Sequence, residues 1–138
     1  MKSSSLWLLT FALLIFTSLA YSSDKISPLN IQGAKTVNTQ EVKKLYDNGA
    51  LFVDVRSNKD WSSGRVPDAM HIELKKVFSN KSLSEEASME EAIVIYCNGE
   101  KCLRSSKATV LAVSWGFKKV FYYRDGFPAW KKAGYPVE

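Results

Sequence analysis

One loop of the sequence holds two cysteines and two cations that could support thiol chemistry. Cys97 directly follows the apolar, β-branched run at residues 92–96, and a helical pattern begins at Ser105. Lys101 and Arg104 lie between them. A cysteine reacts as its thiolate, so it needs surroundings that favour a negative charge. A thiol between the end of a buried strand and the start of a helix has such surroundings, and Cys97 is therefore the candidate nucleophile.

The loop after Cys97 is expected to cradle an anion. Unpaired backbone N–H groups at a helix start carry partial positive charge, and the two cationic side chains add full charges nearby. Such surroundings can lower a cysteine pKa from about 8.5 into the range of roughly 3.5–7.5. The candidate substrate-binding residues are those of the loop, namely Asn98, Gly99, Glu100, Lys101, Cys102, Leu103 and Arg104.

The second cysteine, Cys102, leaves several interpretations open. Four residues separate it from Cys97, a spacing that allows a local disulfide, a resolving thiol acting as a redox partner, or a two-thiolate site for a soft metal such as Cu(I). It could also be a bystander. Two classes of function follow: an enzyme with a cysteine nucleophile, and a non-catalytic module for thiol redox chemistry or metal binding.

Alternating strand and helix patterns surround the loop. Strands are expected at residues 36–37, 51–53, 70–72, 92–96 and 120–123. Helices are expected between Asn38 and Gly49 and at 58–62, 105–115 and 128–133, with one or two short pieces within 75–87. This alternation predicts an α/β fold of three layers, a parallel sheet with helices on both faces. Ligands bind such sheets beyond the carboxyl ends of the strands, where Cys97 is placed.

Length and composition limit the alternatives. A chain of 138 residues with 46% hydrophobic residues suits one globular domain with a packed core. Two cysteines and one histidine exclude a disulfide-framework miniprotein, a four-thiolate zinc site and a His-rich catalytic metal cluster. The net charge of +5 is spread over separated Lys-Lys pairs without a basic block, so nucleic-acid binding is not expected.

The first twenty residues have the pattern of a secretory signal peptide. Lys2 and three serines precede an apolar run from Leu6 to about Leu19, which is shorter than the roughly 18–20 residues that cross a membrane. Cleavage is expected after Ala20, with Ser22 as the alternative, and an uncleaved membrane anchor is the competing interpretation. The mature protein would then work in the periplasm or be secreted, in an oxidising compartment.

Five short motifs follow one another between residues 36 and 137. They are Val-Asp-Val-Arg at 53–56, Gly-Arg-Val-Pro-Asp-Ala-Met-His-Ile at 64–72, Ile-Tyr-Cys at 95–97, Arg-Ser-Ser-Lys-Ala at 104–108, and Asp-Gly-Phe-Pro-Ala-Trp-Lys-Lys-Ala-Gly-Tyr-Pro-Val at 125–137. The second resembles Gly-His-Ile-Pro-Gly-Ala-x-Asn-Ile, and the last resembles Gly-Gly-x-x-x-Trp-x-x-x-Gly-x-Pro-Val, both of the rhodanese family. The span as a whole resembles a single-domain rhodanese, a sulfurtransferase.

The resemblance implies a rhodanese-like fold with a central, mostly parallel five-stranded sheet flanked by helices. It also implies that Cys97 attacks the outer sulfur of a donor such as thiosulfate, releases sulfite and becomes a persulfide, from which a thiol or cyanide takes the sulfur. The loop amides, Lys101 and Arg104 would stabilise charge. We expect Asp54 and Arg56 to orient the sheet end, and His71 to have a structural role.

The active loop departs from the family pattern. It has eight residues from Cys97 to Arg104, whereas common rhodaneses have six. Phosphatases and arsenate reductases of the same fold have five residues between cysteine and arginine, and here there are six. The spacing matches neither class, so an enzyme of the phosphatase or arsenate reductase kind remains an alternative to the sulfurtransferase.

The expected domain organisation is a signal peptide at residues 1–20, a lead-in segment at 21–33 and a rhodanese domain at 34–138. The expected partners are a small anionic sulfur donor and a thiol acceptor. No cofactor and no metal is expected, and membrane contact is expected only during export. The protein is expected to be a monomer.

Overall fold

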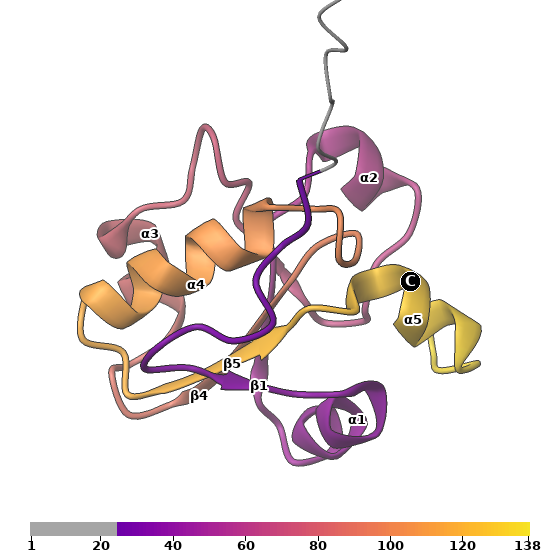
Figure 1. The fold of residues 1–138 in the computed structure, drawn as a ribbon, viewed down its shortest axis with the longest axis horizontal. Coiled ribbons are helices and arrows are strands. Elements are labelled where there is room, and N and C mark those ends of the chain that lie inside the picture. Colours follow the sequence, from indigo (N-terminus) through magenta and orange to yellow (C-terminus); the bar gives the residue numbers. More distant parts are fainter. Residues whose placement is uncertain (1–24) are drawn as a thin grey trace, which may run out of the picture.

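A five-stranded parallel sheet forms the centre of the protein in the computed structural model, which describes residues 25–138 (Figure 1). The strands lie in the order β1-β5-β4-β2-β3, and every neighbouring pair is parallel. Their bounds are β1 (Lys35–Thr36), β2 (Leu51–Asp54), β3 (Met70–His71), β4 (Ala92–Tyr96) and β5 (Lys119–Tyr123). The predicted α/β fold is confirmed, and the sheet is parallel throughout rather than mostly so.

Within the described residues, five helices connect or follow the strands: α1 (Thr39–Asp47), α2 (Asn58–Ser62), α3 (Asn80–Glu86), α4 (Arg104–Ser114) and α5 (Gly126–Lys132). The predicted capping pair begins α1, because Asn38 accepts from the N–H of Glu41 and the Glu41 carboxylate accepts from the N–H of Asn38. A second capping box, formed by Ser79 and Ser82, places a single helix within 75–87. The helix predicted at 128–133 starts earlier, at Gly126.

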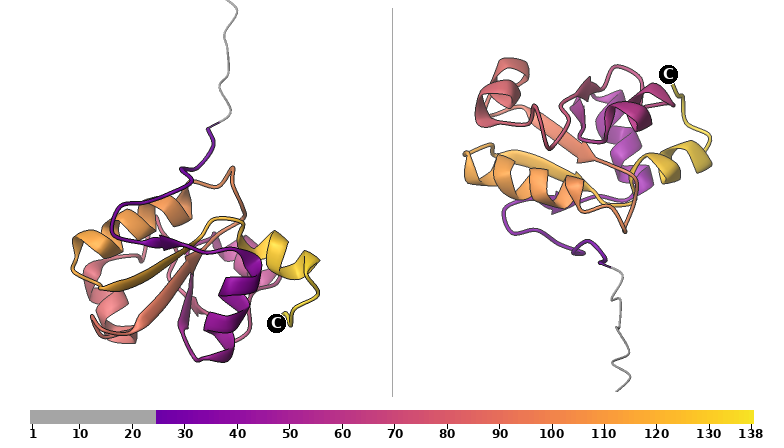
Figure 2. Two further views of the ribbon diagram at one scale, coloured as in Figure 1. Left: turned by 60° about the horizontal axis from the view of Figure 1, so that its bottom comes forward. Right: turned by 90° about the horizontal axis from the view of Figure 1, so that it is seen from above.

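The two faces of the sheet carry separate apolar clusters. Side chains alternate along a strand, so Ile93 and Ile95 of β4 face one side, and Val94 and Tyr96 face the other. The first side packs against Leu83 of α3, Ala87 just after that helix, and Ala108 and Ala112 of α4. The second packs against residues of α1 and α5, namely Val42, Phe127 and Trp130. The helices therefore lie on both faces, as a three-layer fold requires (Figure 2).

The carboxyl ends of four strands lie in one row. Asp54 pairs with both His71 and Tyr96, and Tyr96 pairs with Tyr123. The segments that leave β2, β3, β4 and β5 therefore begin side by side. From β4 the chain crosses to β5 on one side, whereas β2 and β3 lie on the other, so Cys97 follows the strand at the topological switch point.

The predicted signal peptide, residues 1–20, lies outside the described residues, and so does the start of the lead-in segment. Within residues 25–138, no helix has the length and apolar character needed to cross a membrane.

Residues 25–33, here called the N-terminal strap, run without regular structure before β1.

Candidate active site

Cys97 and Cys102 are joined in a disulfide. Their Cα atoms are 6.4 Å apart, within the range of about 4.4–6.8 Å that disulfides usually span. Cys102 donates its N–H to the carbonyl oxygen of Gly99 over 3.0 Å, so a tight turn brings it back to the end of β4. Cys97 is fully buried, whereas Cys102 is partly exposed. In this oxidised form neither sulfur is a thiolate, so the pair is neither a nucleophile nor a metal site.

The N-terminus of α4 faces the sulfur of Cys97. The N–H of Ser105 donates to Sγ over 3.3 Å, and the Ser105 hydroxyl oxygen lies 3.1 Å from Sγ. Ser105 is itself buried. Two donors at the positive end of a helix will stabilise negative charge on Sγ once the disulfide is reduced. The sequence motif contained Ser105, but its contact with Cys97 became visible only in the structure.

Gly126 allows α5 to pack tightly against the backbone of Cys97. It has a φ of +67°, and a Cβ at this position would collide with the Cys97 carbonyl oxygen. The N–H of Phe127 donates to that same carbonyl oxygen over 2.9 Å. The backbone of Cys97 is thus held by α5, and its sulfur is held by α4.

A buried ion pair supports the sheet edge beside Cys97. Arg56 donates from Nη2 to the Asp54 carboxylate over 2.6 Å and to the Gly64 carbonyl oxygen over 2.7 Å. Tyr96 donates its hydroxyl to the same carboxylate over 2.7 Å. Burial alone would lower the pKa of Arg56, but the hydrogen bond and charge of Asp54 raise it above its usual value. Asp54 and Arg56 orient the strand ends, the role expected of them.

Asn98 connects the start of the loop to this framework. Its side-chain oxygen accepts from Arg56 over 3.3 Å, and its amide nitrogen donates to Asp60 of α2 over 3.0 Å. Burial acts to raise the pKa of Asp60, but the hydrogen bonds from Asn98 and Ser57, together with nearby arginine charges, hold that pKa below its usual value. Asn98 therefore positions the loop.

His71 makes two contacts that fit a structural role. Its Nε2 lies 2.9 Å from the carbonyl oxygen of Arg56. Its ring also stacks on Trp61, with the ring centroids 4.7 Å apart. It ties β3 and α2 to the segment that leaves β2.

Arg104 pairs with Glu73, an acidic residue that no motif of the sequence indicated. The guanidinium forms an ion pair with Glu73 and donates to the carbonyl oxygen of Val55 over 3.3 Å. The hydrogen bond from Arg104 is the main cause that holds the pKa of Glu73 below its usual value. Glu73 follows β3 by two residues and is buried, so the ion pair joins the β3 end to the start of α4.

A basic depression of about 300 Å³ opens beside this ion pair. It is lined by Ser57, Asn58, Lys59, Glu73, Lys75, Lys76 and Arg104. Four cations against one carboxylate favour an anion there. The lysines come from α2 and from the segment after β3, so only the fold brings them to the active loop.

The remaining loop residues vary in their contacts. Lys101 is exposed, and Leu103 and Gly99 are partly exposed. Gly99 has a φ of +104°, a conformation that favours glycine. Glu100 is exposed and faces Arg124, with 3.5 Å between the charged atoms. Lys101 therefore lies on the surface of the loop, while both cysteines pack against the apolar core.

Comparison with known protein families identifies one that matches most of the chain. The Rhodanese-like domain family matches residues 38–133. The chain belongs to this family. The matched residues include β2 to β5, the loop from Cys97 to Arg104 and the start of α5 that holds Cys97.

This rhodanese-like domain aligns with most of the length of its relatives. It is 29% identical over 108 residues to the thiosulfate sulfurtransferase GlpE of Pseudomonas syringae, covering 75% of this chain and 92% of the relative. The crystal structure of the BH2092 protein from Bacillus halodurans is 25% identical, with a TM-score of 0.66 and coverage of 76% and 77%. The human single-domain sulfurtransferase TSTD1, 24% identical with a TM-score of 0.58 and coverage of 72% and 96%, shares the fold.

The N-terminal strap of this rhodanese-like domain is bonded to the active loop. The N–H and the hydroxyl of Ser27 both donate to the carbonyl oxygen of Glu100 over 2.7 Å. Arg124, which follows β5, donates to the Ser27 carbonyl oxygen from Nε over 3.2 Å and from Nη2 over 3.1 Å. Tyr122 adds a hydrogen bond to Pro28. The strap and Arg124 therefore hold the active loop at Glu100.

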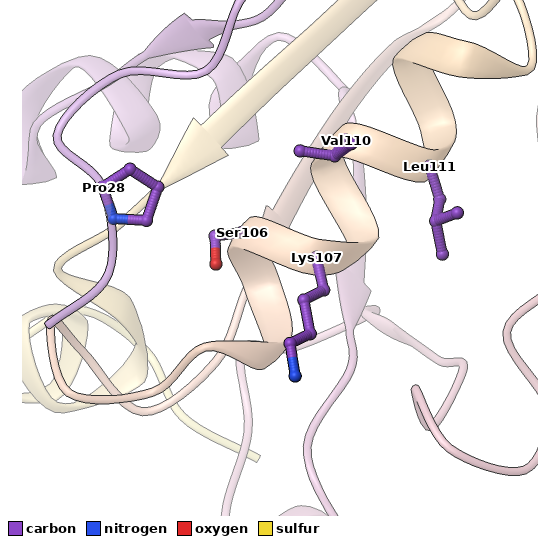
Figure 3. A pocket seen from close by; sticks show the side chains of 5 residues that line it. All are labelled: Pro28, Ser106, Lys107, Val110 and Leu111. Carbon is purple, nitrogen blue, oxygen red and sulfur yellow. The ribbon is translucent and has the colours of Figure 1, made fainter. Parts of the chain in front are cut away.

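The strap also forms one side of an apolar groove of about 440 Å³, lined by Pro28, Ser106, Lys107, Val110 and Leu111 (Figure 3). Val110 and Leu111 are exposed on the outer face of α4. Neither cysteine lines this groove, so it is separate from the reactive sulfur.

Proposed function

We propose that this rhodanese-like domain is a sulfurtransferase that carries a sulfane sulfur on Cys97 as a persulfide. Its membership of the family and its likeness to relatives named thiosulfate sulfurtransferase support this. The observation that carries the proposal is the position of Cys97 Sγ, at the carboxyl end of β4 and within hydrogen-bond distance of the N–H and the hydroxyl of Ser105. This arrangement fits a thiolate nucleophile.

In the proposed reaction the disulfide must first be reduced, because only a Cys97 thiolate can attack. It attacks the outer sulfur of thiosulfate, a new S–S bond forms, and the donor's own S–S bond breaks with its electron pair leaving on sulfite. A thiol or cyanide then attacks the outer sulfur of the persulfide, and the Cys97 thiolate leaves. Neither step needs a histidine base, because the nucleophile is already ionised and the leaving groups are stable anions.

The proposal is tested by a single turnover with reduced protein. After the reductant is removed without air, adding thiosulfate should release one sulfite for each Cys97. In the presence of cyanide, thiocyanate should form as well. Absence of sulfite would contradict the proposal.

The disulfide itself favours one second candidate, a thiol redox module that transfers no sulfur. Such a module would exchange electrons with dithiols but would leave thiosulfate intact. The same sulfite measurement separates the two functions.

We propose that Arg104 and the basic depression attract the anionic donor. Replacing the guanidinium in Arg104→Gln should lower kcat/KM for thiosulfate by roughly ten- to a thousandfold, the scale of one lost contact to a developing anion. Initial rates of sulfite release from reduced protein measure this. Lys118→Gln is the matched control, because Lys118 is paired with Glu90 next to the start of β5, away from the loop. Equal kinetics in both variants would remove Arg104 from the site.

We also propose that the domain is exported, with cleavage near Ala20, and acts as a periplasmic or secreted monomer on a small anionic donor and a thiol acceptor. The apolar run and small residues at the N-terminus support export. The Cys97–Cys102 disulfide also supports export, because disulfides form and persist in oxidising compartments. Intact-mass analysis after expression in a secreting host should show the N-terminal segment removed. Full-length chain in the membrane fraction would favour the anchor instead.

A further inference from the structure

Cys102 has no part in the sulfur transfer proposed above, yet it is bonded to the sulfur that carries it. The chain contains two cysteines in all, so each can form an intramolecular disulfide only with the other. The turn from Cys102 N–H to Gly99 sets Cys102 opposite the end of β4. Cys102 therefore reaches Cys97 with the surrounding sheet and helices in place.

We propose that Cys102 is a resolving cysteine, which attacks the Cys97 persulfide, releases hydrosulfide and leaves the Cys97–Cys102 disulfide. This inference rests on the proposed function, because it requires a persulfide on Cys97. It gives the domain a reductive activity, in which sulfane sulfur leaves as hydrosulfide instead of passing to an acceptor thiol. The reductant that completes the cycle is a dithiol.

The bonds and electrons of this step balance. The Cys102 thiolate attacks Sγ of Cys97, which is the inner sulfur of the persulfide. The bond between Sγ and the outer sulfur breaks, and the outer sulfur takes the electron pair and a proton as hydrosulfide. The two cysteines are oxidised to a disulfide and the sulfane sulfur is reduced. With thiosulfate and a dithiol as substrates, the products are sulfite, hydrogen sulfide and the oxidised dithiol.

The two sulfurs differ in a way that directs the reduction of the disulfide. Cys102 is partly exposed and Cys97 is fully buried, so we expect an incoming thiolate to attack Cys102 rather than Cys97. The bond to Cys97 then breaks, and the Cys97 thiolate forms beside the N–H and the hydroxyl of Ser105, both of which can donate to it. Thiol exchange is faster when the leaving thiolate is stabilised. A mixed disulfide forms on Cys102, and the second thiol of the reductant removes it and frees both cysteines.

The surroundings of Cys97 favour this path over transfer to a bulky thiol. Helix α4 contacts the sulfur, and α5 contacts the backbone of Cys97. The strap and Arg124 hold the middle of the loop at Glu100. Cys102 is the nucleophile already inside this enclosure, so it has an advantage of proximity over a thiol that must enter from solution.

The test is a single turnover followed by three measurements: sulfite, hydrosulfide and intact protein mass. Wild-type protein is reduced, freed of reductant without air, and mixed with thiosulfate. Sulfite and hydrosulfide should appear in equal amounts, and the protein should lose two hydrogen atoms as the disulfide forms. Cys102→Ser should release sulfite alone and keep one added sulfur atom. Cys102→Ala serves as a second variant, and wild type without thiosulfate controls for stray oxidation.

The outcomes separate the two proposals. If wild type releases sulfite but keeps the added sulfur and forms no hydrosulfide, Cys102 is not a resolving cysteine and the sulfurtransferase proposal stands. If no sulfite appears from wild type or Cys102→Ser, both proposals fail. Treating the oxidised protein with glutathione and mapping the mixed disulfide should find it on Cys102. Its presence on Cys97 would overturn the direction of reduction.

Discussion

Cys97→Ser should abolish sulfite release from thiosulfate, with a loss of roughly a thousandfold or more, the scale seen when a catalytic nucleophile is removed. A serine hydroxyl stays protonated at neutral pH, and it forms no persulfide. Initial rates of sulfite and thiocyanate formation by reduced protein measure the effect.

Cys102→Ser is the matched control for this substitution, because it removes the other sulfur of the same disulfide. It should still release sulfite and form thiocyanate, since Cys97 remains. Loss of both products in Cys102→Ser, with Cys97→Ser active, would show that the carrier sulfur had been assigned to the wrong residue. Comparison of the thermal transitions of the reduced variants shows whether each is folded.

Asp54→Asn should lower the free energy of unfolding by about 3–5 kcal/mol, the cost of removing one partner of a buried ion pair. Asp54 has no exposed surface, and its carboxylate accepts from the Arg56 guanidinium and the Tyr96 hydroxyl. The amide leaves the Arg56 charge buried at the sheet edge without its partner. Denaturant unfolding of the two proteins, under reducing conditions, measures the difference.

The control for Asp54→Asn is the same change at an ion pair whose aspartate is exposed. Asp47 lies 2.6 Å from Lys43 on α1, which is the same N–O distance as in the Asp54–Arg56 pair. Asp47→Asn should cost under about 0.5 kcal/mol, because water solvates both charges when they separate. Similar losses in the two variants would show that burial does not decide the strength of these pairs.

The sheet was predictable because its strands are short apolar runs with clear ends. Residues 51–53 and 92–96 are buried on both faces, so their sequence is apolar throughout, and both runs form the predicted strands. The ends of α1 and α4 were also predictable, because Gly49 and Gly116 follow these helices closely. The helix in 75–87 was predicted only vaguely, because its buried surface is little more than Leu83 and its start depends on Ser79 and Ser82 capping each other.

The candidate site was predictable only where its residues are neighbours in the chain. Cys97, Cys102 and Arg104 share one loop, and the strand before and the helix after it are visible in the sequence. Glu73 lies 31 residues from Arg104, and no local pattern connects the two charges. The contact becomes foreseeable only when the ends of β3 and β4 are known to lie at the same sheet edge.

The N-terminal strap lies outside the family match, yet it contacts the active loop. The family match begins at residue 38, after both the strap and β1. A protein shortened to the matched residues 38–133 would keep Cys97 and Cys102 but would lack Ser27, which donates twice to Glu100. Arg124 would also lose the carbonyl oxygen it binds. The contacts that hold the active loop therefore extend upstream of the family match, to Ser27 in the strap.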